Sequence, residues 1–319
     1  MRIVVSGSSG HLGEALMRTL REQGHTAVGV DLKPSAWTDQ VGTLTDAGFV
    51  HQCIAGADAV LHTATLHKPH IATHSCQEFV ATNVTGTLNV LEACVAHGVK
   101  TLVFTSTTST FGAALTPPPG APAAWIDETV RPLPKNIYGV TKVAAEDLCE
   151  LFHRLHGLPC LILRTSRFFP EADDNPDVRA QFTNSNTQIN ELLYRRVDIA
   201  DVVSAHLCAL EKAEAIGFAR YIISAATPFA ATDTAALRQD APRVVAGYFP
   251  GYAAEYAHRG WRMFAEIDRV YSSAKAIAEL GWQPAYSFAT ALASLQQQRD
   301  YRSELSRKIG AKGYHAETF

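Results

Sequence analysis

A glycine-rich turn near the N-terminus restricts the fold of this chain more than any other feature. The turn contains Gly7, Gly10 and Gly13, and it follows the apolar run Arg2–Ser6. Apolar residues then recur at helical spacing, namely Leu12, Ala15, Leu16 and Leu20. This order of strand, tight turn and helix indicates a dinucleotide site, in which the glycines permit the bend, the approach of a pyrophosphate and close packing of the helix. The amide groups at the helix start would supply the anion site. A purely structural turn is the alternative, because the spacing G-x-x-G-x-x-G differs from the usual G-x-G-x-x-G.

A second predicted strand, Thr26–Asp31, ends in an acidic residue. A carboxylate at this place can accept hydrogen bonds from the ribose hydroxyls of the adenosine, and it repels a 2′-phosphate. The sequence therefore predicts NAD rather than NADP as the cofactor. Lys33 is the one contrary charge nearby, and an exposed loop lysine is the alternative interpretation of that residue.

Tyr138 and Lys142 are four residues apart, so on a helix they lie on one face. A neighbouring ammonium favours the phenolate and lowers the pKa of the tyrosine from its usual value near 10. Tyrosine and lysine meet at this spacing on many solvated helices, so the pair alone is weak. Together with the glycine turn, it indicates an enzyme that moves a hydride.

Composition excludes several classes of protein. The chain has 319 residues, 47% hydrophobic and 18% charged, with a net charge of −3, which is ordinary for a globular enzyme and argues against nucleic acid or an anionic membrane as the main partner. We find neither an apolar stretch long enough to span a bilayer nor a signal-peptide layout, and therefore expect a cytoplasmic protein. The cysteines are scattered without a C-x-x-C pair, which favours reduced thiols. They are Cys53, Cys76, Cys94, Cys149, Cys160 and Cys208.

Strand-like and helical segments alternate along the chain, which predicts an α/β fold with a doubly wound parallel sheet. The further strands are expected at Ala59–His62, Thr101–Thr105, Cys160–Arg164 and Tyr221–Ser224, and the long helices near Gln77–His97 and Tyr138–His156. Irregular sequence at 170–186 and 227–264 predicts a small mixed lobe. We expect a Rossmann domain at 1–165, completed by about 197–226 and 265–284, a substrate-binding lobe at 166–196 and 227–264, and a C-terminal helix and tail at 285–319.

With these motifs placed, the chain resembles the extended short-chain dehydrogenase/reductases, in particular the NAD-dependent epimerase/dehydratase family. The resemblance runs from Met1 to about Pro284 and also includes His62-Thr63-Ala64, Asn83-Val84-Thr85-Gly86-Thr87 and Phe104-Thr105-Ser106-Thr107. It implies that Thr107 holds the substrate oxygen, that Tyr138 is the general acid or base, and that Lys142 lowers the pKa of Tyr138 and binds the nicotinamide ribose. Ser106 or Thr108 could replace Thr107. The implied cofactor-binding residues are Gly7, Ser9, Gly10, His11, Leu12, Gly13, Asp31, Leu44, Thr63, Ala64, Asn83, Tyr138 and Lys142.

Departures from the family pattern bear on the substrate. Arg167 stands where sugar-nucleotide enzymes usually carry an asparagine, and Tyr194 stands where they carry an arginine that Arg195 and Arg196 could replace. The insertion between them is short, which leaves a nucleotide diphosphate poorly housed. We expect Arg167, with Arg262 or Arg259, to bind a smaller anionic group, because a guanidinium pairs well with a carboxylate or phosphate. A structural salt bridge is the alternative for Arg167, and exposed loop arginines for the other two.

The histidines of the adjoining loop have two interpretations. His67 could touch cofactor or substrate, or it could be an ordinary loop residue. The spacing of His62, His67, His70 and His74 matches no common zinc pattern, so we expect no metal.

The expected function is that of an NAD-dependent oxidoreductase or epimerase that oxidises a secondary alcohol of a sugar-like substrate. A nucleotide-sugar 4-epimerase or dehydratase resembling UDP-glucose 4-epimerase is one alternative, and a non-catalytic NAD-sensing protein is another. The resemblance also implies a homodimer formed by the two long helices. The expected partner is a small molecule, and neither nucleic acid nor a membrane is expected.

Overall fold

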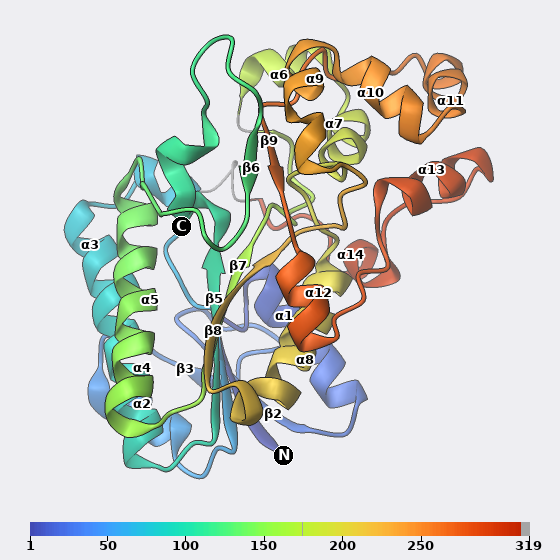
Figure 1. Ribbon diagram of the computed structural model, residues 1–319. Coiled ribbons are helices and arrows are strands. Elements are labelled where there is room, and N and C mark those ends of the chain that lie inside the picture. Colours follow the sequence, from blue (N-terminus) through green and yellow to red (C-terminus); the bar gives the residue numbers. More distant parts are fainter. Residues whose placement is uncertain (174, 314–319) are drawn as a thin grey trace.

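A parallel sheet forms the centre of the molecule in the computed structural model, which describes residues 1–173 and 175–313. Within these residues the sheet has seven strands in the order β3-β2-β1-β4-β5-β7-β8, seen nearly edge-on in Figure 1. They are β1 (Arg2–Ser6), β2 (Thr26–Asp31), β3 (Gln40–Val41), β4 (Ala59–His62), β5 (Thr101–Thr107), β7 (Cys160–Thr165) and β8 (Phe218–Ile223). All neighbouring strands pair in parallel, so the predicted doubly wound fold is confirmed.

Helices cover both faces of this sheet (Figure 1). One face carries α2 (Ala47–Ile54), α4 (Gly86–Ala96) and α5 (Ile137–His156), and the other carries α1 (His11–Glu22), α8 (Ile199–Ile216) and α12 (Ala274–Leu280). Each layer buries its own set of apolar side chains against the sheet. The strands are therefore covered on both sides, which explains why they appear in the sequence as nearly continuous apolar runs.

The order in which strands are added to the sheet reverses between β1 and β4. Strands β2 and β3 lie on one side of β1, and β4 and the later strands lie on the other side. Ligands of open parallel sheets bind beyond the carboxyl ends of the strands at such a reversal. The turn after β1 and the segment after β4 meet at this place. The fold thus brings the glycine turn next to Thr63 and Ala64.

A long helical stretch beside the sheet departs from our expectations. It consists of α3 (Cys76–Val80), a π-helical turn (Ala81–Thr85) and α4. By length and composition alone Cys76–Ala96 could cross a membrane, so the expectation that no apolar stretch is long enough was wrong. Half of this stretch is buried inside the molecule, where α4 packs against α2 and α5. That environment is typical of a core helix.

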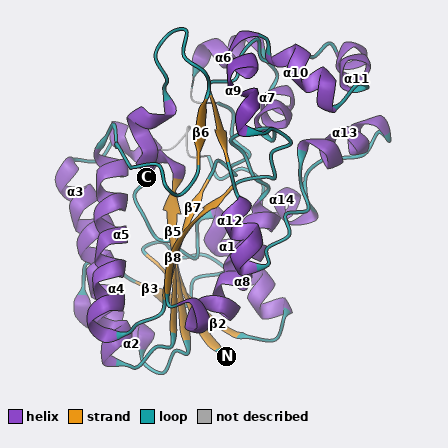
Figure 2. Cartoon of the chain, viewed as in Figure 1, coloured by secondary structure: helices purple, strands orange, loops and turns teal. Residues whose placement is uncertain are grey.

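A second group of elements lies beyond the carboxyl ends of the strands, at the top of Figures 1 and 2. It contains the helices α6 (Pro176–Gln181), α7 (Asn184–Glu191), α9 (Thr234–Gln239), α10 (Ala241–Tyr248) and α11 (Tyr252–Arg259), together with β6 (Ala124–Ile126) paired in parallel to β9 (Arg269–Tyr271). All of these elements except α6 share a further apolar cluster with α13 (Phe288–Gln296). The sequence of 170–186 and 227–264 has no regular pattern, yet the structure contains short helices in both ranges.

The segment after α13 returns to the sheet. It forms α14 (Glu304–Ile309), which packs against α1 and α8 and is followed by residues 310–313. The remainder of the expected tail, 314–319, lies outside the described residues.

Candidate active site

The turn after β1 has a shape that only glycine permits at two positions. Gly7 has a φ of +78°, and a Cβ on it would lie 2.7 Å from the backbone nitrogen of Ala64. A Cβ on Gly13 would lie 1.9 Å from the carbonyl oxygen of Gly7, so α1 packs directly on the turn. Gly10 caps α1 without a side chain, which leaves the first helical turn open to an external anion. This cradle fits the diphosphate of a dinucleotide.

Asp31 at the end of β2 faces the same turn. Its Oδ2 accepts a hydrogen bond from the Ser9 amide at 2.9 Å, and its Oδ1 accepts one from the Lys33 amide at 2.9 Å. The carboxylate therefore lies beside the glycine turn, where an adenosine ribose would approach.

The segment after β4 completes this wall of the site. The Thr63 hydroxyl donates to the Ser6 carbonyl at 2.7 Å, and the Ala64 amide donates to Ser6 Oγ at 3.3 Å. His62 is buried between Ser6 Oγ at 2.6 Å and Thr87 Oγ1 at 3.0 Å, and burial lowers its pKa to about 3. His62 therefore acts as a neutral hydrogen-bonding residue of the core.

Thr107 and Tyr138 form the hydroxyl pair of the site. Thr107 ends β5, Tyr138 is the second residue of α5, and both side chains are buried, with Thr107 next to the phenol. The neighbouring Ser106 points elsewhere, because its hydroxyl donates to the buried Glu146 at 2.6 Å. The structure thus places Thr107 rather than Ser106 against the tyrosine.

Lys142 lies one helical turn after Tyr138 and is almost completely buried. Its Nζ donates to the Thr105 carbonyl at 2.6 Å and lies 3.9 Å from the centre of the Phe104 ring. Burial lowers the pKa of Lys142 to about 7, because water no longer solvates the ammonium. The lysine is therefore close to losing its proton at neutral pH.

The pKa of Tyr138 departs from the prediction. We expected Lys142 to lower it, whereas burial raises it to about 12, opposed only in part by the neighbouring Thr107 hydroxyl. The ammonium of Lys142 donates instead to the Thr105 carbonyl. The prediction was wrong for this structure because the sequence spacing could not show how strongly the phenol is desolvated.

Asn83 lies in the π-helical turn that leads into α4, and its side-chain amide bonds to neighbouring protein groups. Its Oδ1 accepts from the Thr65 hydroxyl at 3.0 Å and from the Leu66 amide at 2.8 Å. Its Nδ2 donates to the Leu66 carbonyl at 2.9 Å and to Thr141 Oγ1 at 3.0 Å. These contacts use the full donor and acceptor capacity of the amide. Asn83 therefore connects the segment after β4 to the helix that carries Tyr138.

The remaining predicted cofactor residues are His11, Leu12 and Leu44. His11 and Leu12 begin α1 and are buried. Leu44 lies farther along, where its carbonyl accepts a hydrogen bond from Asn89 Nδ2 at 2.8 Å.

Arg167, expected at the substrate, lies beyond the end of β7 in an ion-pair network. It donates to Asp173 Oδ2 at 2.7 Å and to the Ala172 carbonyl at 2.9 Å. Arg195 reaches the same Asp173 oxygen at 3.3 Å and pairs with Glu191 at 2.7 Å, and Arg196 also pairs with Glu191 at 2.7 Å. The salt bridge considered as the alternative for Arg167 is thus present.

The other predicted anion-binding arginines also have protein partners. Arg262 donates to the Gln181 carbonyl at 3.2 Å and lies 4.8 Å from the Phe182 ring. Arg259 pairs with Glu255 at 2.6 Å and donates to the Leu295 carbonyl at 2.8 Å. Arg259 therefore stabilises α11 against α13.

His67 lies in an aromatic cluster. Its ring stacks on Phe169 at 5.6 Å and meets His70 edge-on at 4.4 Å, while Phe169 also contacts the ring of His11 at 5.2 Å. Phe169 was not predicted, although it joins the glycine turn to the loop of His67. Among the described residues, no group of three His, Cys, Asp or Glu side chains could hold a metal ion.

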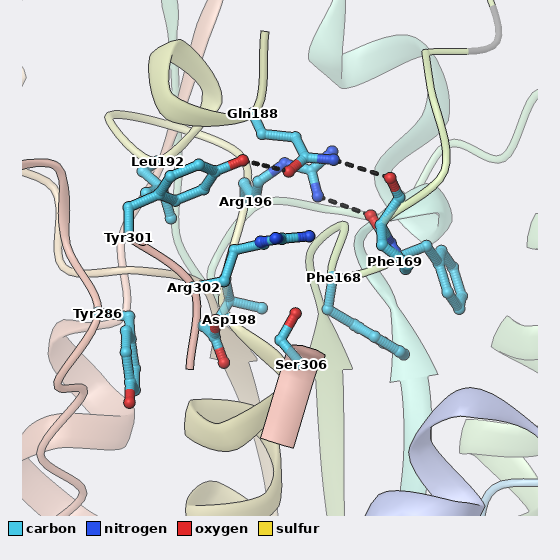
Figure 3. Close-up of a pocket in the computed structure, with 12 residues that line it drawn as sticks. Phe168, Phe169, Gln188, Leu192, Arg196, Asp198, Tyr286, Tyr301, Arg302 and Ser306 are labelled. Atoms are coloured by element: carbon cyan, nitrogen blue, oxygen red, sulfur yellow. Dashed lines mark hydrogen bonds between the residues drawn. The ribbon is translucent and has the colours of Figure 1, made fainter. Parts of the chain in front are cut away.

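A small cavity opens between the lobe and the residues around α14 (Figure 3). Its volume is about 30 Å³, room for about two water molecules. Gln188, Arg196 and Tyr301 line it, and the Tyr301 hydroxyl donates to Gln188 Oε1 at 2.6 Å. Neither Thr107 nor Tyr138 borders it, so this cavity is part of the packing and is too small for a sugar.

The fold and the hydroxyl pair define the class of this protein. A model of the NAD dependent epimerase/dehydratase family matches residues 3–223, and the chain belongs to this family of NAD-dependent enzymes.

Individual relatives differ in their activities. A uronate dehydrogenase of Pseudomonas syringae pv. tomato is 28% identical over 178 residues, which are 53% of this chain and 60% of that protein. A UDP-glucose 4-epimerase of Halalkalibacterium halodurans is 29% identical over 191 residues, 56% of this chain and 53% of the relative. The chain thus spans less than two thirds of the length of these relatives. A short-chain dehydrogenase/reductase superfamily protein of Agrobacterium tumefaciens, solved with bound NAD, superposes with a TM-score of 0.66 at 25% identity, covering 97% of this chain and 99% of that one.

Proposed function

We propose that this protein oxidises a secondary alcohol of a small, anionic, sugar-like substrate and transfers the hydride to NAD. The observation that carries the proposal is the buried pair of Thr107, at the end of β5, and Tyr138, with Lys142 one turn along the same helix as Tyr138. NAD supplies the hydride acceptor. Thr107 holds the substrate oxygen. The phenol of Tyr138 first releases its own proton to solvent, and the resulting phenolate receives the substrate hydroxyl proton at its oxygen. In the reverse direction Tyr138 donates that proton, which the raised pKa keeps on the phenol at neutral pH.

The arginines near β7 support an anionic substrate. Arg167 and Arg195 converge on one carboxylate, that of Asp173, and about a fifth of each arginine side chain remains exposed. A place that holds one carboxylate between two guanidinium groups suits the carboxylate of a uronate or an aldonate. The uronate dehydrogenase among the relatives agrees with this choice.

The arrangement of the chain supports two further parts of the proposal. Residues 166–196 and 227–264 would form the substrate lobe over the Rossmann domain of 1–165, completed by 197–226 and 265–284. The α4 and α5 layer would pair across a homodimer, since Val80 before α4 and Val140 on α5 are exposed apolar residues. Light scattering on the purified protein tests the dimer, and a monomeric mass would contradict it.

A substrate screen tests the proposal directly. Uronates, aldonates, free sugars, UDP-sugars and TDP-sugars are each incubated with NAD, and both NADH formation and isomerisation are followed. We expect uronates or aldonates to give NADH. Efficient conversion of UDP-glucose or UDP-galactose would instead support a nucleotide-sugar epimerase, as in the Halalkalibacterium relative.

Variants of the hydroxyl pair test the chemistry. Tyr138→Phe should lower turnover by roughly a hundredfold or more while NAD affinity stays near that of the wild type. Thr107→Val should also lower turnover, whereas Ser106→Ala should mainly lower stability, because Ser106 bonds Glu146. If Tyr138→Phe kept half of the activity, the assigned acid–base role would be wrong.

A further inference from the structure

The segment that follows α14 crosses the glycine turn, although the two are about three hundred residues apart in sequence. Lys312 Nζ donates to the Ser9 carbonyl at 2.8 Å and forms an ion pair with Glu14. The Lys312 amide donates to Glu171 Oε1 at 2.9 Å, and this same oxygen lies 3.3 Å from His11 Nε2. Residues 310–313, here called the strap, thus contact the turn, the first turn of α1 and the segment after β7.

Glu14 gives the strap its electrostatic importance. It is the acidic residue in the first turn of α1, and its side chain is largely buried. Although burial acts to raise its pKa, hydrogen bonds with Lys312 and Arg18 hold the pKa of Glu14 below the usual value. The residue is therefore a carboxylate at neutral pH, in the same helical turn whose amides form the anion site.

A carboxylate at this place opposes the binding of a diphosphate, because like charges repel strongly where water is partly excluded. Arg18 pairs with Glu14 at 2.7 Å from the side away from the turn, one helical turn farther along α1. Lys312 approaches from the Ser9 side and contacts the turn itself. The ammonium of Lys312 therefore partly neutralises the negative charge of Glu14 on the side where the cofactor phosphates would approach.

We infer that Lys312 sets the affinity for the cofactor diphosphate, by compensating the charge of Glu14 and by holding the Ser9 carbonyl of the glycine turn. Lys312 acts through these two neighbours and is a positioning residue. The strap thereby links the segment after β7 to the cofactor turn through Glu171.

Calorimetric titration of the cofactor-free protein tests this role without relying on turnover. NAD, ADP and adenosine are titrated into the wild type, Lys312→Met, Glu14→Gln and the double variant. We expect Lys312→Met to bind NAD and ADP about threefold to tenfold more weakly, with a smaller loss at high salt, since such charge interactions are partly screened. Adenosine, which has no phosphate, should bind with unchanged affinity.

The double variant separates charge compensation from a general loosening of the turn. Glu14→Gln should restore most of the NAD affinity lost in Lys312→Met, which a double-mutant cycle measures as coupling. Lys312→Arg should retain affinity, and Lys308→Met is the matched control, because Lys308 lies on α14 and pairs with the exposed Glu304. The inference is overturned if Lys312→Met binds NAD as the wild type does or more tightly, or if adenosine is weakened as much as NAD.

Discussion

At the scale of single residues, the buried charge of Lys142 has a measurable consequence. Its pKa of about 7 in the folded protein lies below its ordinary value of 10.5, so the folded state binds this proton less well than the unfolded state. Its contribution to stability therefore increases as the pH rises from 7 towards 10.5 and is lowest below pH 7.

Lys142→Met removes this dependence. In the cofactor-free protein, we compare the melting temperature of Lys142→Met with that of the wild type. We expect the variant's melting temperature to be highest relative to the wild type at pH 6 and to be lower relative to it at pH 9. The change in relative stability corresponds to at most about 3 kcal/mol over the two pH units between pH 7 and pH 9. Differential scanning calorimetry at both values measures it. A difference that does not vary with pH would show that Lys142 keeps its proton throughout.

Asp31 yields a second prediction at this scale. Asp31→Ala should weaken NAD binding by about tenfold, because the ribose loses its acceptor, and should affect NADP much less. The preference for NAD would then narrow. Lys33→Ala should change the ratio of the two affinities little. Equal affinity of the wild type for NAD and NADP would show that Asp31 does not control the choice.

The sequence predicted which residues gather at the site better than how each one behaves there. Tyr138, Lys142 and Thr107 belong to motifs whose order along the chain is informative by itself. The direction of the pKa of Tyr138 depends instead on burial by residues from other segments, which the spacing of two residues does not encode.

At the scale of elements, the contact between α1 and the turn after β1 depends on Gly13. Gly13→Ala would place a Cβ 1.9 Å from a backbone oxygen, so the helix must move. We expect a loss of about 1–3 kcal/mol in unfolding free energy and at least a tenfold weaker binding of NAD.

Gly247→Ala on α10 is the matched control, because nothing lies within 4 Å of its added carbon. That variant should bind NAD normally and be as stable as the wild type or slightly more stable. Similar losses in both variants would contradict this explanation.

The elements themselves were unequally predictable. Strands β1, β2 and β4 begin and end as expected, since buried parallel strands are apolar runs bounded by turn residues. Helix α7 was missed because its buried face is polar. Asn186 and Asn190 on that face donate to the Arg262 carbonyl, both at 3.0 Å. An apolar periodicity cannot reveal a helix that packs through side-chain amides.

At the scale of the whole molecule, contacts between distant segments carry much of the organisation. The strap on the glycine turn and the pairing of β6 with β9 join residues that no local motif connects. Glu191 belongs to the same class of contact. It is completely buried at the end of α7 and pairs with Arg195 and Arg196 close to the strand ends.

Acid unfolding should reveal the contribution of Glu191. Although burial acts to raise its pKa, Arg195 and Arg196 lower it to about 2, below its ordinary value of 4.5. A lowered pKa stabilises the folded state above pH 4.5, and this stabilisation, on the order of 3 kcal/mol, is lost as the pH falls towards 2. Glu191→Gln leaves the buried Arg196 without its carboxylate and Arg195 with Asp173 alone, so the variant should be clearly less stable than the wild type at pH 7. The urea midpoints of the two proteins should converge between pH 5 and 3, because the wild type loses the stabilisation that the variant already lacks.

Glu304→Gln, which alters an exposed pair with Lys308, should show almost no difference from the wild type at any pH. A gap between wild type and Glu191→Gln that stays constant down to pH 3 would mean that Glu191 does not stabilise the molecule through its charge.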